Sequence, residues 1–163
     1  MNYLLAAILL LAPHLPRTTA QLYARIIKTE AARKKVDPLL VVSFIHVETV
    51  RGWNTRVKSV TNDYGLCQVH VAARGSETFL GREEQLFIPK VNIREWVRLA
   101  DMWRAYHQKE GDDSHPWWAH LKWGYKVKDT NHAMKVKRLY ESLKRKFRPK
   151  PVAWNTLQHT RAD

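Results

Sequence analysis

The sequence predicts a mainly α-helical domain, and three observations support this prediction. Apolar residues recur at helical spacing in several separate segments, whereas no alternating, strand-like run exceeds three or four residues. The length of 163 residues suits one domain with a substantial core. Hydrophobic residues make up 45% and charged residues 26%, which are globular values rather than those of a disordered chain.

The chain begins with an apolar run that is too short to cross a bilayer. Residues 3–12 are almost wholly apolar, whereas a spanning helix needs about 20 such residues. This length, followed by the small residues Thr18, Thr19 and Ala20, is typical of a secretory signal peptide cleaved before Gln21. We expect residues 1–20 to be a signal peptide or short anchor of a protein exported to the periplasm, envelope or exterior. A buried first helix remains the alternative.

Two helices should follow this segment. Residues 21–35 carry apolar side chains at helical spacing with Lys and Arg between them, as in an amphipathic helix. Asp37 and Pro38 are typical of a helix start, with Asp as the N-cap and Pro in the first turn. Residues 39–48 are apolar on nearly every face, so this helix should form the buried centre of the fold.

The second half should hold two more long helices. Residues 52–63 indicate a loop, and a short helix is expected to begin near Gln68. Residues 89–107 place Trp96 and Trp103 on one helical stripe, where we expect both to pack in the core. A helix is expected from Pro116, and a last helix carries an apolar stripe through Phe147. The domain should therefore span residues 21–147, with residues 148–163 as a flexible tail.

The charge balance predicts polyanionic partners and gives no sign of a metal. The net charge is +13, and basic residues crowd one face of the last helix, which favours anionic cell-wall or envelope polymers; sequence-specific nucleic-acid binding is not expected. The single cysteine, Cys67, excludes an intrachain disulfide and a multi-cysteine zinc site. His46 and Glu48 match half of a zinc-deaminase motif whose paired cysteines are absent, and no HExxH pair occurs. We expect no metal and no cofactor.

Glu48 is the leading candidate for chemistry. It ends the most apolar helix of the predicted domain, where desolvation and unpaired carbonyls both favour the protonated carboxyl. Glycoside cleavage needs such a group to protonate the leaving oxygen. A solvated glutamate where the helix reaches the surface is the alternative.

A polar turn follows Glu48 within twenty residues of the helix. Gly65 permits a tight turn or a positive φ, and the amide of Gln68 can both donate and accept hydrogen bonds, as recognition of an N-acetyl sugar requires. Ser59 adds a hydroxyl group. An ordinary loop is the alternative.

These segments together resemble the soluble lytic transglycosylase family, which is related to goose-type lysozyme. The resemblance rests on Glu48-Thr49, Trp53-Asn54, Ser59 and Gly65-Leu66-Cys67-Gln68, with the family's spacing of six residues from Ser59 to Gly65. Asp37-Pro38-Leu39-Leu40 and Pro89-Lys90-Val91-Asn92-Ile93 resemble the family's entries to two helices. It covers roughly residues 21–145.

The resemblance implies a lysozyme-like fold and a peptidoglycan lytic transglycosylase. Glu48 would protonate the oxygen of the MurNAc–GlcNAc bond and then, as a base, activate the C6 hydroxyl of the same MurNAc, giving a 1,6-anhydro end. The residues implied to contact the glycan strand are Ser59, Tyr64, Gly65, Leu66 and Gln68. Trp53 and Trp123 are candidates to stack on sugar rings.

The chain departs from the family pattern at the third motif, Ala-Tyr-Asn-Gly. The segment at its place is His120-Leu121-Lys122-Trp123-Gly124, with Tyr125 shifted. Tyr140 is a candidate for the late family Tyr that steadies the glutamate. Two other functions therefore stay open. One is a hydrolytic lysozyme in which Asp63 is the second acid; the other is a non-catalytic basic module that binds cell wall or nucleic acid.

Overall fold

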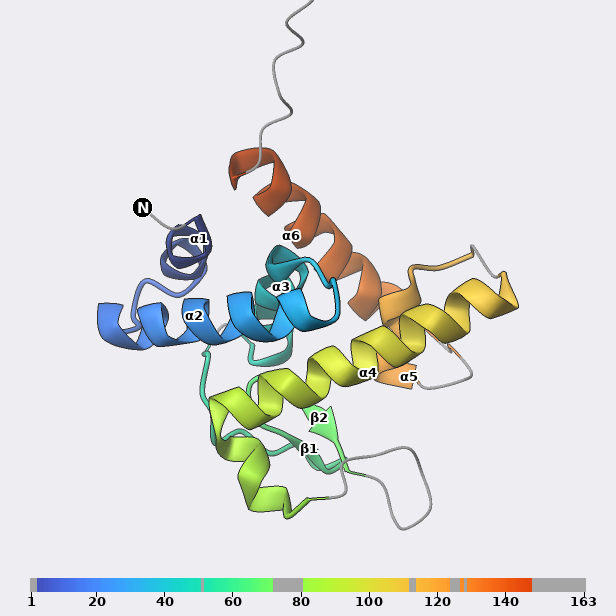
Figure 1. The fold of residues 1–163 in the computed structure, drawn as a ribbon, viewed down its shortest axis with the longest axis horizontal. Coiled ribbons are helices and arrows are strands. Elements are labelled where there is room, and N and C mark those ends of the chain that lie inside the picture. Colours follow the sequence, from blue (N-terminus) through green and yellow to red (C-terminus); the bar gives the residue numbers. More distant parts are fainter. Residues whose placement is uncertain are drawn as a thin grey trace, which may run out of the picture.

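The structure is a computed structural model that describes residues 3–50, 52–71, 81–111, 114–123, 127 and 129–147. Most of these residues are helical, so the predicted mainly α fold is confirmed (Figure 1). The predicted flexible tail, residues 148–163, lies outside the described residues. The helices are α1 (Tyr3–Leu11), α2 (Arg17–Arg33), α3 (Pro38–Glu48), α4 (Pro89–Glu110), α5 (His120–Trp123) and α6 (Asn131–Phe147), with the 3₁₀ helices η1 (Glu83–Phe87) and η2 (Trp117–Ala119).

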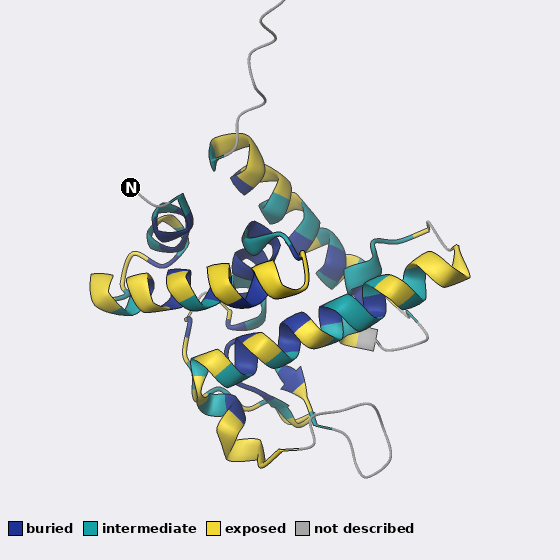
Figure 2. Cartoon of the chain, in the orientation of Figure 1, coloured by how far each residue is buried: buried dark blue, intermediate teal, exposed yellow. Residues whose placement is uncertain are grey.

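Helix α3 is the buried centre that its sequence predicts. It begins where expected because the Asp37 carboxylate accepts a hydrogen bond from the backbone N–H of Leu39 at 2.9 Å, and Pro38 occupies the first turn. Every residue of its middle, from Leu39 to Ile45, is buried. Helices α1, α2 and α6 pack around it, which the dark core of Figure 2 makes visible.

Helix α4 packs against α2, and its Trp96 contacts Phe44 of α3. An ion pair joins the two helices: Glu30 of α2 is 2% exposed, and Nη2 of the half-exposed Arg94 of α4 lies 3.3 Å from its Oε1. Trp96 and Trp103 are both buried, which confirms their predicted place in the core. The helix ends at Gly111, which adopts a left-handed conformation with φ of 67°.

Helix α1 is an integral element of this fold. Leu4, Ala7 and Ile8 are fully buried against the helices around them. Helix α2 runs through Ala20 and Gln21, the residues on either side of the predicted cleavage point, and Ala20 is itself fully buried. In the full chain, residues 3–20 are therefore packed as the alternative of a buried first helix expects. Export with cleavage before Gln21 stays a prediction. Among the described residues, no helix has both the length and the apolar character needed to cross a membrane.

The polar turn after α3 forms a small antiparallel hairpin. Strand β1 (Asp63–Tyr64) pairs with β2 (Val69–His70), with Asp63 opposite His70 and Tyr64 opposite Val69. The prediction of a short helix near Gln68 is therefore wrong. Gln68 has a positive φ of 45°, which a helix does not allow, and the chain turns there into β2.

Candidate functional site

Glu48 lies at the end of α3 and faces α6. Its side chain is only 9% exposed, so the carboxylate is almost completely withdrawn from water. His132, in the first turn of α6, places its Nε2 atom 2.9 Å from Oε1 of Glu48. The two residues lie far apart in the sequence, and the packing of α3 against α6 brings them together.

The contact between Glu48 and His132 is close but not a directed hydrogen bond. Both ring nitrogens of His132 are buried, and neither has a hydrogen-bond partner within the described part of the chain. The short distance is therefore an electrostatic contact between the imidazole ring and the carboxylate. The edge of the His132 ring packs on Phe44, with ring centroids 5.5 Å apart, which holds the imidazole beside Glu48.

Cys67 lies in the turn between β1 and β2, and its thiol is fully buried. Burial raises the pKa of this thiol well above its ordinary value, and the charge of the Glu48 carboxylate raises it further. The thiol is therefore a buried, protonated side chain of this turn.

The turn is fixed to the rest of the domain by Asn92 of α4. This buried amide accepts a hydrogen bond from the Cys67 N–H at 2.7 Å and donates to the carbonyls of Tyr64 and Leu86 at 2.7 and 3.0 Å. Gly65 has a φ of 72°, and a Cβ atom there would lie 2.3 Å from the Leu86 carbonyl oxygen and 2.5 Å from Asn92 Nδ2. Only glycine fits this position.

Gln68 directs its amide nitrogen into the turn. Nε2 donates to the carbonyl of Gly65 at 2.8 Å and, more weakly, to that of Val57 at 3.3 Å. The amide nitrogen therefore stabilises the loop, and the carbonyl oxygen of the side chain is the part that remains for a ligand. Of the donor and acceptor functions expected of this amide from the sequence, the donor function is used within the loop.

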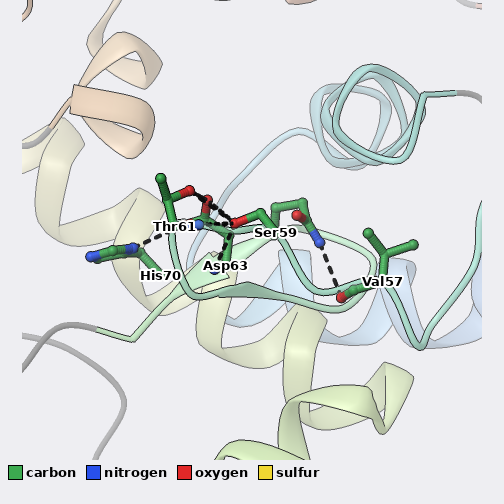
Figure 3. A network of polar contacts seen from close by, with 6 residues as sticks. Val57, Ser59, Thr61, Asp63 and His70 are labelled. Carbon is green, nitrogen blue, oxygen red and sulfur yellow. Dashed lines mark hydrogen bonds and ion pairs between the residues drawn. The ribbon is translucent and has the colours of Figure 1, made fainter.

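Ser59 and Asp63 belong to a network inside the loop (Figure 3). Oδ2 of Asp63 accepts hydrogen bonds from Ser59 Oγ at 2.8 Å and from Thr61 Oγ1 at 2.6 Å, and Oδ1 lies 2.8 Å from His70 Nδ1. Burial alone would raise the pKa of Asp63, but the hydrogen bonds from Thr61, Ser59 and His70 outweigh it, so this pKa is lowered. Asp63 is therefore held ionised and is a poor proton donor.

Four residues expected to contact substrate are buried instead: Trp53, Tyr64, Gly65 and Leu66. Trp53 is 1% exposed and stacks on Tyr23, with centroids 6.1 Å apart, while Leu66 is fully buried. Tyr64 is 3% exposed, and its hydroxyl bonds to Glu83. These buried side chains offer almost no exposed surface to a sugar. The side chain of Trp123 lies outside the described residues, as do Gly124 and Tyr125.

The residue beside Glu48 is not the one expected from the family pattern. Tyr140, the candidate for the steadying tyrosine, donates its hydroxyl to Asp37 Oδ2 at 2.9 Å, at the opposite end of α3 from Glu48. His132 occupies the position next to the carboxylate. One signal could have pointed to it: His132 lies one turn before Val136 on the apolar stripe of α6, where a polar residue needs a reason.

One other cluster of the described residues could hold a metal ion. His107, His115 and His120 bring their ring nitrogens within 4.8 Å of one another. The expectation of no metal rested on sequence motifs, which do not detect this arrangement. The cluster shares no hydrogen bond or ion pair with Glu48.

Comparison with protein-family models, with curated proteins and with solved structures finds no match to this chain.

Proposed function

We propose that this protein is a peptidoglycan lytic transglycosylase with Glu48 as its single acid and base. The observation that carries the proposal is the Glu48 carboxylate, which is 9% exposed and lies 2.9 Å from the His132 imidazole. A nearly buried carboxyl next to an imidazole suits a group that must give up a proton and later take one back, because the imidazole can stabilise the carboxylate by charge.

The proposed reaction has two proton transfers and uses no water. Glu48 donates its proton to the glycosidic oxygen as the C1–O4 bond breaks, and the departing GlcNAc keeps that proton. The Glu48 carboxylate then removes the proton from the C6 hydroxyl of the same MurNAc, whose oxygen forms the new C1–O6 bond. Glu48 ends protonated as it began, and the imidazole of His132 stabilises the carboxylate between the two steps.

Asp63 favours this route over hydrolysis. Hydrolases of the usual kind place a second carboxyl across the bond, as a nucleophile or as a base for water. The Asp63 carboxylate already accepts from two hydroxyls and faces His70, so both of its oxygens are occupied. Use as a nucleophile or base would break that network, whereas the transglycosylase route needs no second acid.

A basic surface accounts for attraction to the polymer. The exposed basic residues of α6 are Lys135, Arg138, Lys144, Arg145 and Lys146. With a chain net charge of +13, this face favours anionic wall or envelope polymers at low salt. The same face would serve a non-catalytic binding module, so activity has to separate the two functions.

The test is digestion of purified peptidoglycan by wild type and by Glu48→Gln, with the released fragments identified by mass. Fragments with 1,6-anhydro ends that disappear in the variant support the proposal. Fragments with reducing ends would assign a lysozyme, and no release by the wild type would assign a binding module.

Two further variants complete the design. Glu141→Gln changes an exposed glutamate on α6 and should digest the wall as the wild type does. His132→Gln should lower kcat more than it changes KM, because His132 acts on the Glu48 carboxylate rather than on the sugar. Equal activity of His132→Gln and wild type would remove His132 from the mechanism.

A further inference from the structure

A further polar cluster among the described residues consists of three imidazoles from three consecutive segments. His107 lies in the last turn of α4, His115 in the connection after it, and His120 at the start of α5. Nε2 of His120 lies 3.4 Å from His107 Nδ1 and 3.4 Å from His115 Nε2. His120 is 5% exposed, and the other two are partly exposed.

Two of the three separations, both 3.4 Å, are those of ligands around a tetrahedral ion, and the third pair lies within 4.8 Å. Zinc binds imidazole nitrogen at about 2.0–2.1 Å, so two ligands of a tetrahedral site lie roughly 3.3–3.4 Å apart. A ring nitrogen carries one in-plane proton or one in-plane lone pair, so Nε2 of His120 can form a full hydrogen bond with only one of its two neighbours at a time. A metal ion between the rings would accept a lone pair from all three.

The surroundings hold the rings in place for such a role. The Trp103 ring stacks on His120, with centroids 5.3 Å apart and planes 13° from parallel, and the Tyr106 ring meets His120 edge-on. Ser114 Oγ lies 2.9 Å from His115 Nδ1. With Nδ1–H donating to this hydroxyl, the Nε2 lone pair of His115 faces the other two nitrogens, as a ligating histidine requires.

We infer that His107, His115 and His120 bind one Zn²⁺ ion, with water completing the tetrahedron from the exposed side. Neutral imidazoles suit zinc and related late transition metals, and a fourth, open position is common in three-histidine sites. The ion would join the end of α4 to the start of α5 and so restrain the His115–Ala119 connection. This site is independent of the function proposed for Glu48.

The test is titration of the full-length, chelator-treated protein with Zn²⁺ by calorimetry, and with Co²⁺ by visible absorption. The expected result is one equivalent bound, Co²⁺ bands of a four-coordinate site, and a higher Tm with Zn²⁺. His107→Gln and His115→Gln should each abolish the Co²⁺ bands. His14→Gln, an exposed histidine outside the cluster, is the matched control and should bind as the wild type does.

A milder variant guards against loss of fold. Ser114→Ala keeps all three ligands and should weaken zinc binding by about 10–100-fold, as loss of a group that orients a ligand typically does. Far-ultraviolet circular dichroism of the metal-free variants checks that each is folded. Binding that is absent in the wild type, or that His14→Gln weakens as much as His107→Gln does, would overturn the assignment.

Discussion

The Gly65→Ala variant tests the mechanical link between the hairpin and α4. Two costs add at this position. A non-glycine residue in the left-handed region costs about 1–2 kcal/mol, which the φ of 72° imposes whatever the surroundings. The added Cβ would also lie 2.3 Å from the Leu86 carbonyl oxygen and 2.5 Å from Asn92 Nδ2, so one of these groups must move.

Movement of Asn92 should account for the larger share of the stability lost in Gly65→Ala. Its amide makes three hydrogen bonds in a fully buried position. A buried polar group that loses its partner costs about 1–3 kcal/mol, so the lost Nδ2 hydrogen bonds and the backbone strain together predict a loss of roughly 2–5 kcal/mol. That is a large fraction of the about 5–15 kcal/mol that stabilises a typical domain.

Gly111→Ala provides the matched control. Gly111 has nearly the same φ, 67°, but a Cβ there meets no atom within 4 Å. It should therefore lose only the backbone term of about 1–2 kcal/mol. The assay is urea unfolding of wild type and both variants, with circular dichroism as the probe of unfolding. Equal losses in the two variants would refute the claim that Asn92 and the Leu86 carbonyl close the space over Gly65.

Three more predictions follow from burial and charge. Ile8→Ala should destabilise the full-length protein by about 2–5 kcal/mol, whereas Leu10→Ala on the same helix, with Leu10 48% exposed, should change unfolding little; equal effects would contradict the packing of α1. Asp63 has a lowered pKa in the fold, so the stability that its carboxylate contributes is complete above its unfolded pKa and is lost as pH falls through the folded pKa. Asp63→Asn should therefore be less stable than wild type near neutral pH. The difference between their urea midpoints should disappear as the pH is lowered. The Cys67 thiol should resist a thiol reagent in the folded protein and react at once in denaturant, since its burial raises its pKa; rapid reaction of the native protein would contradict its place in the core.

Local signals predicted the helices well because their causes are local. Asp37 and Pro38 start α3, Pro89 starts α4, and each helix begins at the residue these signals indicate. The β-hairpin was missed because the positive φ of Gln68, a residue with no glycine-like freedom, depends on the hydrogen bonds of the folded turn.

The site was predictable only in part. The spacing of Glu48, Ser59 and Gly65 belongs to one continuous stretch of chain, so it can be read from the sequence alone. The pairing with His132 depends on how α6 packs on α3, and no local pattern encodes that contact. The histidine cluster could not be predicted from local pattern either, because Gly111 ends α4 between His107 and His115 and removes any helical spacing between them.

The central claim is that Glu48 drives cleavage of the glycan strand without water as a reactant. Digestion of peptidoglycan in water labelled with heavy oxygen tests it most directly. The claim predicts 1,6-anhydro fragments that carry no label and that are absent with Glu48→Gln. Labelled reducing ends would show that water is the nucleophile, and fragments that persist in Glu48→Gln would show that Glu48 is not the acid.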